Sequence, residues 1–144
     1  MEEALSLIWN KSPLELNNLI FCEGESGGFG FYQKRIDHNF VEGETIYLYA
    51  EPKYYSIIKI GEELFEIHFK EDLYILDLEG TILWGQKDFL EYHITSYAPN
   101  KEVFIFNTIT QDDPFPKGEY QFLLILKDVA SQKTVEQAIS FVIE

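Results

Sequence analysis

The C-terminal part of the chain, residues 116–144, constrains the fold more than any other part. It opens with a proline–glycine turn signal, and an apolar run over residues 122–126 follows. Polar residues 127–133 separate this run from a second strand-like stretch, residues 134–143. A turn, a buried strand, a polar loop and a closing strand are typical of the end of a small β-sandwich. The segment therefore predicts an all-β fold, and it says little about chemistry.

The clearest single strand of the chain begins at Phe65. Phe65, Ile67 and Phe69 alternate with polar residues, which predicts a half-buried strand. The apolar register changes near Glu71, and this change predicts a bulge before residues 73–78 prolong the strand.

Further strand signals occupy much of the remaining chain. They cover residues 31–36, 45–50, 91–97 and 102–110, with turn residues between them. About eight or nine short strands at this spacing predict an antiparallel, immunoglobulin-like β-sandwich. We expect one domain over residues 1–144, because no linker or change of composition divides the chain.

The first residues are the exception to this β pattern. Leu5, Ile8 and Trp9 have helical spacing, and the acidic Glu2 and Glu3 suit a helix N-terminus. Residues 1–12 are therefore expected to form an N-terminal arm that is either a short helix or extended.

Turn and strand residues in four places resemble those of small uncharacterised prokaryotic proteins with an immunoglobulin-like or fibronectin type III-like β-sandwich domain. The matching pieces are residues 40–44 with 46–51, residues 72–80, residues 116–120, and Asp128 with Ser131 and Lys133. The resemblance implies the fold and carries no activity with it. The Cys–Trp–Cys pattern of antibody domains does not occur in the sequence.

The charge of the chain narrows the classes of partner. Asp and Glu number 25 against 11 Lys and Arg, so the formal net charge is −14. A phosphate backbone and an anionic membrane would be repelled, which argues against nucleic-acid and membrane partners. Basic proteins and cations stay open, and so does any small-molecule ligand. The acidic start does not resemble a signal peptide, so we expect a cytoplasmic protein as given, or an extracytoplasmic one if a leader was removed.

Reactive groups are few and are not grouped into motifs. Cys22 is the single cysteine, so neither an intrachain disulfide nor a cysteine-based zinc site is expected. His38, His68 and His93 lack metal-ligand spacing. The glycine-rich residues 24–30 lack the lysine and the helix of a phosphate loop. We expect no catalytic residues, no metal and no cofactor, so the protein is predicted not to be an enzyme.

Aromatic residues are the best candidates for binding. Tyr47 and Tyr49 lie on the strand face opposite Ile46 and Leu48, where exposed rings would form a contact surface. The predicted binding residues are Tyr47, Tyr49, Tyr54, Tyr55, Phe29 and Phe31. We expect a non-catalytic protein-interaction or assembly module that contacts a protein partner or a second copy through this face or a strand edge. The alternative is a carbohydrate-binding module that uses the same tyrosines with Trp9 or Trp84.

Overall fold

The computed structural model describes residues 8–144, which form nine strands after one helical turn. The strands are β1 (Glu15–Cys22), β2 (Asn39–Phe40), β3 (Ile46–Lys53), β4 (Ile58–Gly61), β5 (Leu64–Asp77), β6 (Ile82–Ser96), β7 (Ile105–Ile109), β8 (Gly118–Asp128) and β9 (Thr134–Ile143). The helical turn covers residues 8–11, and the amide and hydroxyl of Ser12 both donate to the Ile8 carbonyl. The remainder of the predicted arm, residues 1–7, lies outside the described residues. The prediction of an all-β fold with antiparallel sheets is confirmed.

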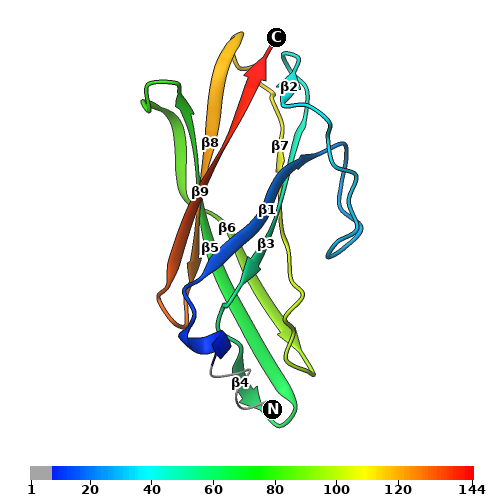
Figure 1. The fold of residues 1–144 in the computed structure, drawn as a ribbon, viewed down its shortest axis with the longest axis vertical. Helices are drawn as coiled ribbons and strands as arrows, with labels where there is room; N and C mark the ends of the chain where they lie inside the picture. The colour runs from blue at the N-terminus through cyan, green and yellow to red at the C-terminus, as the bar shows by residue number, and fades with distance from the viewer. Residues whose placement is uncertain (1–7) are drawn as a thin grey trace.

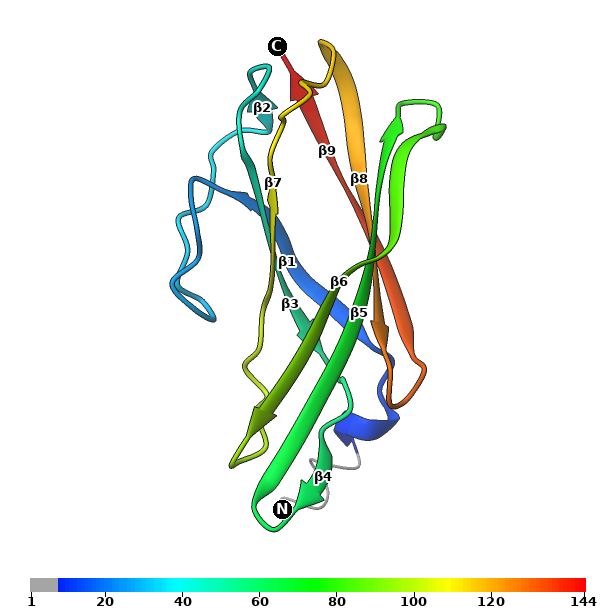
Figure 2. The ribbon, with the colours of Figure 1, turned by 180° about the vertical axis from the view of Figure 1, so that it is seen from behind.

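Two sheets make up the fold. The smaller has the order β1-β3-β7, and the larger has the order β2-β9-β8-β5, with β6 on the opposite side of β5. β4 pairs with the first residues of β5, and every pair is antiparallel except the short contact of β2 with β9. Figures 1 and 2 show that the larger sheet curls and that the two sheets face each other.

Apolar side chains from both sheets fill the space between them. Ile46 and Leu48 of β3 meet Phe69 of β5 and Phe122 of β8 in one buried cluster. The rings of Phe122 and Phe141 stack with 4.4 Å between their centroids. Removal of these apolar side chains from water supplies the main driving force for folding.

The core-facing residues of β5 keep the same alternation along the strand, so the predicted change of the apolar pattern near Glu71 does not occur, although the pairing register with β6 shifts there. Ile67, Phe69, Leu73 and Ile75 are all buried on the core side, and Glu71 occupies the same face between them with no exposed surface. Because a carboxylate interrupts the apolar series, the hydropathy pattern alone resembles a shift of register.

The predicted bulge does occur beside this point, but the extra residues belong to β6. Glu71 pairs with Leu90 and Leu73 with Gln86, so three residues of β6 lie opposite Asp72. The Asp72 carboxylate accepts a hydrogen bond from the Asp88 amide and pairs with Lys127 at 2.8 Å. Lys127 of β8 also contacts the Asp88 carboxylate at 2.7 Å, so this one cation bridges the two carboxylates and links the bulge to β8.

Residues 31–36 do not form the predicted strand. They make only isolated bridges, Cys22 with Lys34 and Gly28 with Phe31. The Gly27 amide donates to the Phe31 carbonyl, and the Phe31 amide donates to the Gly28 carbonyl. The glycine-rich segment therefore closes on itself as a small loop, whose place over β3 is described below.

Candidate functional site

The predicted aromatic residues do not form one exposed face. Tyr49 and Tyr55 are fully buried, so the expectation that their rings face solvent is wrong. Tyr47, Tyr54 and Phe29 are partly buried. Phe31 alone among the six is largely exposed, at 73%.

Tyr49 is buried because the glycine-rich loop lies over the outer face of β3. The Gly30 amide donates to the Tyr49 hydroxyl at 2.9 Å, and this hydroxyl donates to the Glu51 carboxylate at 2.6 Å. The ring packs between Tyr32, with 4.4 Å between centroids, and Phe104, at 5.6 Å. Burial and the neighbouring carboxylate raise the pKa of the Tyr49 phenol. Its role is to anchor the loop to the sheet.

Tyr55 contacts three separate parts of the chain, which contain Trp9, Phe69 and Asn100. Its hydroxyl donates to the Asn100 carbonyl at 2.7 Å, and its own carbonyl accepts a hydrogen bond from the Trp9 indole. Its ring meets Phe69 edge to face, with 5.3 Å between centroids. These contacts are those of a core residue, and Trp9 is buried with it.

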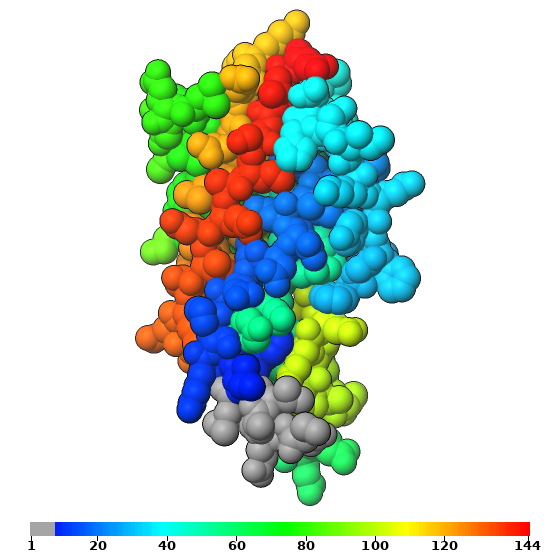
Figure 3. Space-filling model, viewed as in Figure 1, coloured from blue at the N-terminus to red at the C-terminus, as the bar shows by residue number. Residues whose placement is uncertain are grey.

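Exposed apolar side chains gather instead on the β5–β6 hairpin. The residues are Leu78 (65% exposed), Ile82 (57%), Leu83 (53%) and Trp84 (42%). The hairpin forms a green lobe at the edge of the molecule in the space-filling view (Figure 3). Single exposed apolar residues are ordinary, but a group of four on one hairpin is a candidate contact surface.

A cleft of about 550 Å³ opens beside this hairpin. Its floor consists of the core residues Leu73, Ile75 and Phe122. Trp84 and Phe89 of β6, whose rings meet edge to face at 5.7 Å, line it together with Phe115. The remaining lining residues are Thr108, Ile109, Thr110, Asp112, Asp113, Pro114 and Pro116. The cleft therefore leads from solvent to the core between the two sheets.

Two strand edges border this side of the molecule. Within residues 8–144, β6 pairs only with β5, and β7 pairs only with β3. Figure 2 shows the β5–β6 hairpin and β7 diverging toward the end of the molecule that carries the C-terminus. Unpaired edges offer main-chain donors and acceptors to another strand.

Tyr92 of β6 closes part of the β7 edge. Its hydroxyl donates to the Phe106 carbonyl at 3.1 Å and accepts a hydrogen bond from the Phe106 amide at 3.2 Å. Burial raises the pKa of the Tyr92 phenol, so the hydroxyl keeps its proton as a donor. Both outward main-chain groups of Phe106 are thus satisfied by one side chain.

Gln111 fixes the segment that follows β7. Its amide nitrogen donates to the carbonyl of Glu44 at 2.6 Å and to that of Val41 at 3.4 Å. Its amide oxygen accepts a hydrogen bond from the Phe115 amide at 3.1 Å. Because Phe115 lines the cleft, Gln111 sets the position of that wall and of the two aspartates between them.

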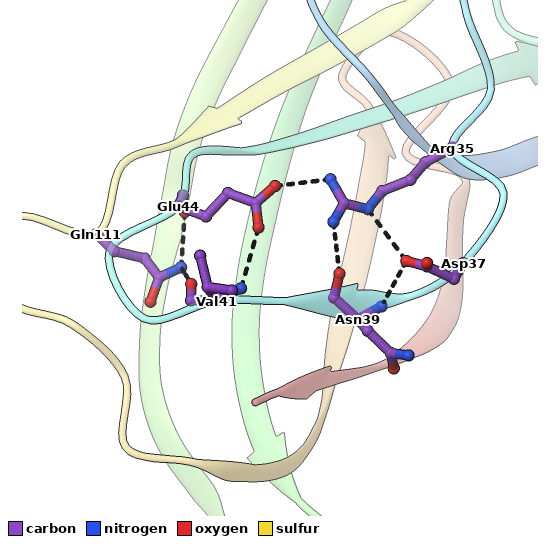
Figure 4. Close-up of polar contacts among 6 residues, drawn as sticks. All are labelled: Arg35, Asp37, Asn39, Val41, Glu44 and Gln111. Atoms are coloured by element: carbon purple, nitrogen blue, oxygen red, sulfur yellow. Dashed lines mark hydrogen bonds and ion pairs between the residues drawn. The ribbon is translucent and has the colours of Figure 1, made fainter.

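Arg35 contacts Glu44, the residue whose carbonyl accepts a hydrogen bond from Gln111. Figure 4 shows its guanidinium between the carboxylates of Glu44, at 2.7 Å, and Asp37, at 3.5 Å. It also donates to the Asn39 carbonyl at 2.5 Å and lies 4.1 Å from the centroid of the Phe40 ring. These contacts fix the loop whose carbonyl groups, those of Val41 and Glu44, accept hydrogen bonds from Gln111.

A buried polar pair lies in the core near Tyr92. The Asn107 side-chain nitrogen donates to Oε1 of Glu71 at 3.0 Å. Glu71 Oε2 and Asn107 Oδ1 have no partner within residues 8–144. Burial raises the pKa of the Glu71 carboxyl to about 7, because the apolar surroundings disfavour its charged form. A protonated carboxyl can donate to Asn107 Oδ1 and so satisfy both groups.

The histidines lie away from the cleft. His68 and His93 are directly opposite each other on β5 and β6, with stacked rings 4.8 Å apart. His68 contacts Glu91 at 2.5 Å, and His93 contacts Glu66 at 3.1 Å. His38 contacts the Ser140 carbonyl. Over residues 8–144, no group of three His, Cys, Asp or Glu side chains is arranged to hold a metal ion.

No protein-family model matches the chain, and no curated protein is similar to it. In the part of the chain that the structure describes, no helix has the length and apolar character to cross a membrane. The candidate site therefore depends on its geometry alone: sequence analysis named Trp84, but not Phe89, Phe115 or the cleft that all three line.

Proposed function

We propose that this protein is a non-catalytic protein-interaction or assembly module with an immunoglobulin-like or fibronectin type III-like domain. The observation that carries the proposal is the apolar cleft between the β5–β6 hairpin and β7, bordered by strand edges without partners. A site of this kind presents apolar surface and main-chain hydrogen-bonding groups together, which is what an added strand of a partner requires.

The strand order supports the fold assignment. β1, β3 and β7 face β9, β8, β5 and β6, which corresponds to strands A, B and E facing G, F, C and C′ of a fibronectin-type sandwich. Tyr120, at the start of β8, donates its hydroxyl to the Pro116 carbonyl at 2.5 Å. A tyrosine in this place, bonded to the backbone a few residues upstream, is the tyrosine corner of such domains.

Replacing the Tyr120 hydroxyl tests the corner. We expect Tyr120→Phe to lower the free energy of unfolding by about 1 kcal/mol, because the Pro116 carbonyl loses its partner while the ring stays in place. Urea denaturation measures the change. Tyr97→Phe removes a hydroxyl from a residue that is 84% exposed and should leave the stability unchanged. Equal effects of the two variants would contradict a special role for the corner.

The lining of the cleft supports binding over catalysis. Most of its side chains are aliphatic or aromatic, and its polar groups are two threonines and two aspartates. Among the described residues that line it, none is a histidine, cysteine or lysine, and the two aspartates are its acid–base groups. Apolar contact with a few polar groups at the rim is the composition of a recognition site.

Loss of binding by a hairpin variant tests the proposed function. We expect the wild-type protein to retain a partner protein from a lysate of its source. The variant Ile82→Ser/Trp84→Ser should no longer retain this partner, because it removes two of the four exposed apolar side chains on the hairpin. Ile36→Ser is the matched control, since Ile36 is 99% exposed and lies in the loop before β2. Identical bound proteins for all three, identified by mass spectrometry, would overturn the proposal.

A carbohydrate-binding module is the second candidate. Trp84 is 42% exposed beside the threonines and aspartates of the cleft, a combination that suits stacking on a sugar face with hydroxyl contacts. Trp9, which the sequence also nominated, is buried. We expect this alternative to show itself as quenching of tryptophan fluorescence by oligosaccharides that is lost in Trp84→Phe. The interaction module predicts no such quenching.

A further inference from the structure

We propose that the cleft receives an extended segment of a partner protein in which basic and apolar side chains alternate, added as a strand to the edge of β7 at Thr108. The inference rests on the proposed function and specifies its partner. Three observations carry it: the direction of the β7 main chain, the apolar cleft beside it, and the charge at the rim.

The free part of the β7 edge begins at Thr108. The main-chain amide and carbonyl of Phe106 point away from β3, because both contact the Tyr92 hydroxyl. Alternate residues of a strand direct these groups to the same side, so those of Thr108 also point away from β3. Tyr92 thus ends the accessible edge on one side, and the accessible part lies where Thr108 and Thr110 line the cleft.

An added strand at this edge would place every second side chain in the cleft. Phe89, Phe115 and the Trp84 ring surround that position, with the core residues below. The cleft volume of about 550 Å³ is in the range that buries several apolar groups. A small apolar ligand would fill the cleft but leave the main-chain groups of Thr108 unused, so the geometry favours a peptide strand.

The charge at the rim selects a basic partner. Asp112 and Asp113 follow the free edge directly and are both exposed. Neither forms an ion pair with any residue that the structure describes, and Lys117 is the one cation in residues 110–117. A second copy of the chain would bring its own net charge of −14 against this rim, which opposes self-association. Lysine or arginine beside the apolar anchors would instead be attracted.

A synthetic peptide serves as the probe. It has nine residues with blocked ends, and lysine alternates with valine, leucine and phenylalanine. One control peptide carries glutamate in place of lysine, and a second has the same composition with the lysines and apolar residues in separate blocks. We expect calorimetry at low ionic strength to detect binding of the alternating lysine peptide alone. We also expect slower hydrogen exchange at the Thr108 amide, measured by NMR.

Two variants locate the binding. Thr108→Pro removes an amide that points away from β3, so the sheet tolerates it as an edge proline while an added strand is blocked. We expect it to keep its circular dichroism spectrum and lose the peptide. Asp112→Asn/Asp113→Asn should weaken the peptide roughly five- to tenfold and reduce the salt dependence. The matched control, Glu62→Gln/Glu136→Gln, removes two exposed charges elsewhere and should change the affinity less than about twofold.

Distinct outcomes separate this inference from the proposed function. Equal binding of the lysine and glutamate peptides, or unchanged binding by folded Thr108→Pro, would overturn the inference. If the lysine peptide does not bind but capture of a partner protein still depends on Trp84, the inference is overturned and the proposed interaction module is retained. A wild-type dimer in sedimentation that Thr108→Pro abolishes would replace the basic partner with a second copy.

Discussion

Glu71→Gln is expected to stabilise the protein at pH 8.5 and to make its stability less dependent on pH. The amide that this substitution introduces offers one donor and one acceptor, which match Asn107 Oδ1 and Nδ2. The wild-type carboxyl has a folded-state pKa of about 7 and a reference value of 4.5, so folding binds a proton between these values. The stabilisation is fully present below pH 4.5 and is lost as the pH rises through 7.

Urea denaturation of both proteins from pH 5.5 to 8.5 measures this effect. The wild type should lose about 2 kcal/mol relative to the variant across that range, since each pKa unit corresponds to about 1.4 kcal/mol. Other carboxylates titrate in both proteins and cancel in the difference. Glu119→Gln, which removes one exposed charge from β8, is the matched control for a change of net charge. A flat difference for Glu71→Gln would refute the pKa assignment.

Gly85→Ala is expected to destabilise the β5–β6 hairpin by about 1–3 kcal/mol. Gly85 pairs directly with Tyr74, whose ring lies over it. A Cβ at Gly85 would overlap Cδ1 of that ring and lie 2.7 Å from Cε1, so the ring must move. An aromatic ring that covers a glycine on the neighbouring strand also shields the backbone from water, and the alanine variant loses this cover.

A double-mutant cycle separates overlap from other effects. In a Tyr74→Ala background, Gly85→Ala removes no contact, and we expect it to be neutral or slightly stabilising because alanine is the better strand residue. Thermal unfolding of the four proteins gives the coupling. Additive effects of the two substitutions would show that the ring does not determine the need for glycine.

The sequence predicted the strands whose apolar residues alternate without interruption. Ile67 and Phe69 face the core as expected, because a period of two has one explanation in a half-buried sheet. Glu71 misled the same reasoning: its carboxyl is accommodated inside by a hydrogen bond from Asn107, a residue of another sheet that the local sequence does not reveal. Similarly, residues 31–36 have strand composition, but loop closure through Gly28 removes them from the sheets.

The candidate site was harder to predict than the strands. Tyr49 occupies the outer strand face that the sequence indicated, and burial by the distant Gly30 loop removes it from solvent. The cleft joins residues from β5, β6, β7 and the segment before β8, which only the strand order brings together. Patterns along one strand report its faces; they do not report which edges remain unpaired or what covers a face.

The central position of β5 has a consequence for how fast the protein folds. β5 joins β6 through a tight hairpin, and β8 joins β9 in the same way, so both pairs form from neighbouring residues. The pairing of β5 with β8 instead brings Phe69 to Asp128, and loops across much of the chain must close first. Proteins dominated by such distant pairings fold in milliseconds to seconds. We therefore expect closure of the β5–β8 pairing, rather than formation of either hairpin, to limit the rate of folding.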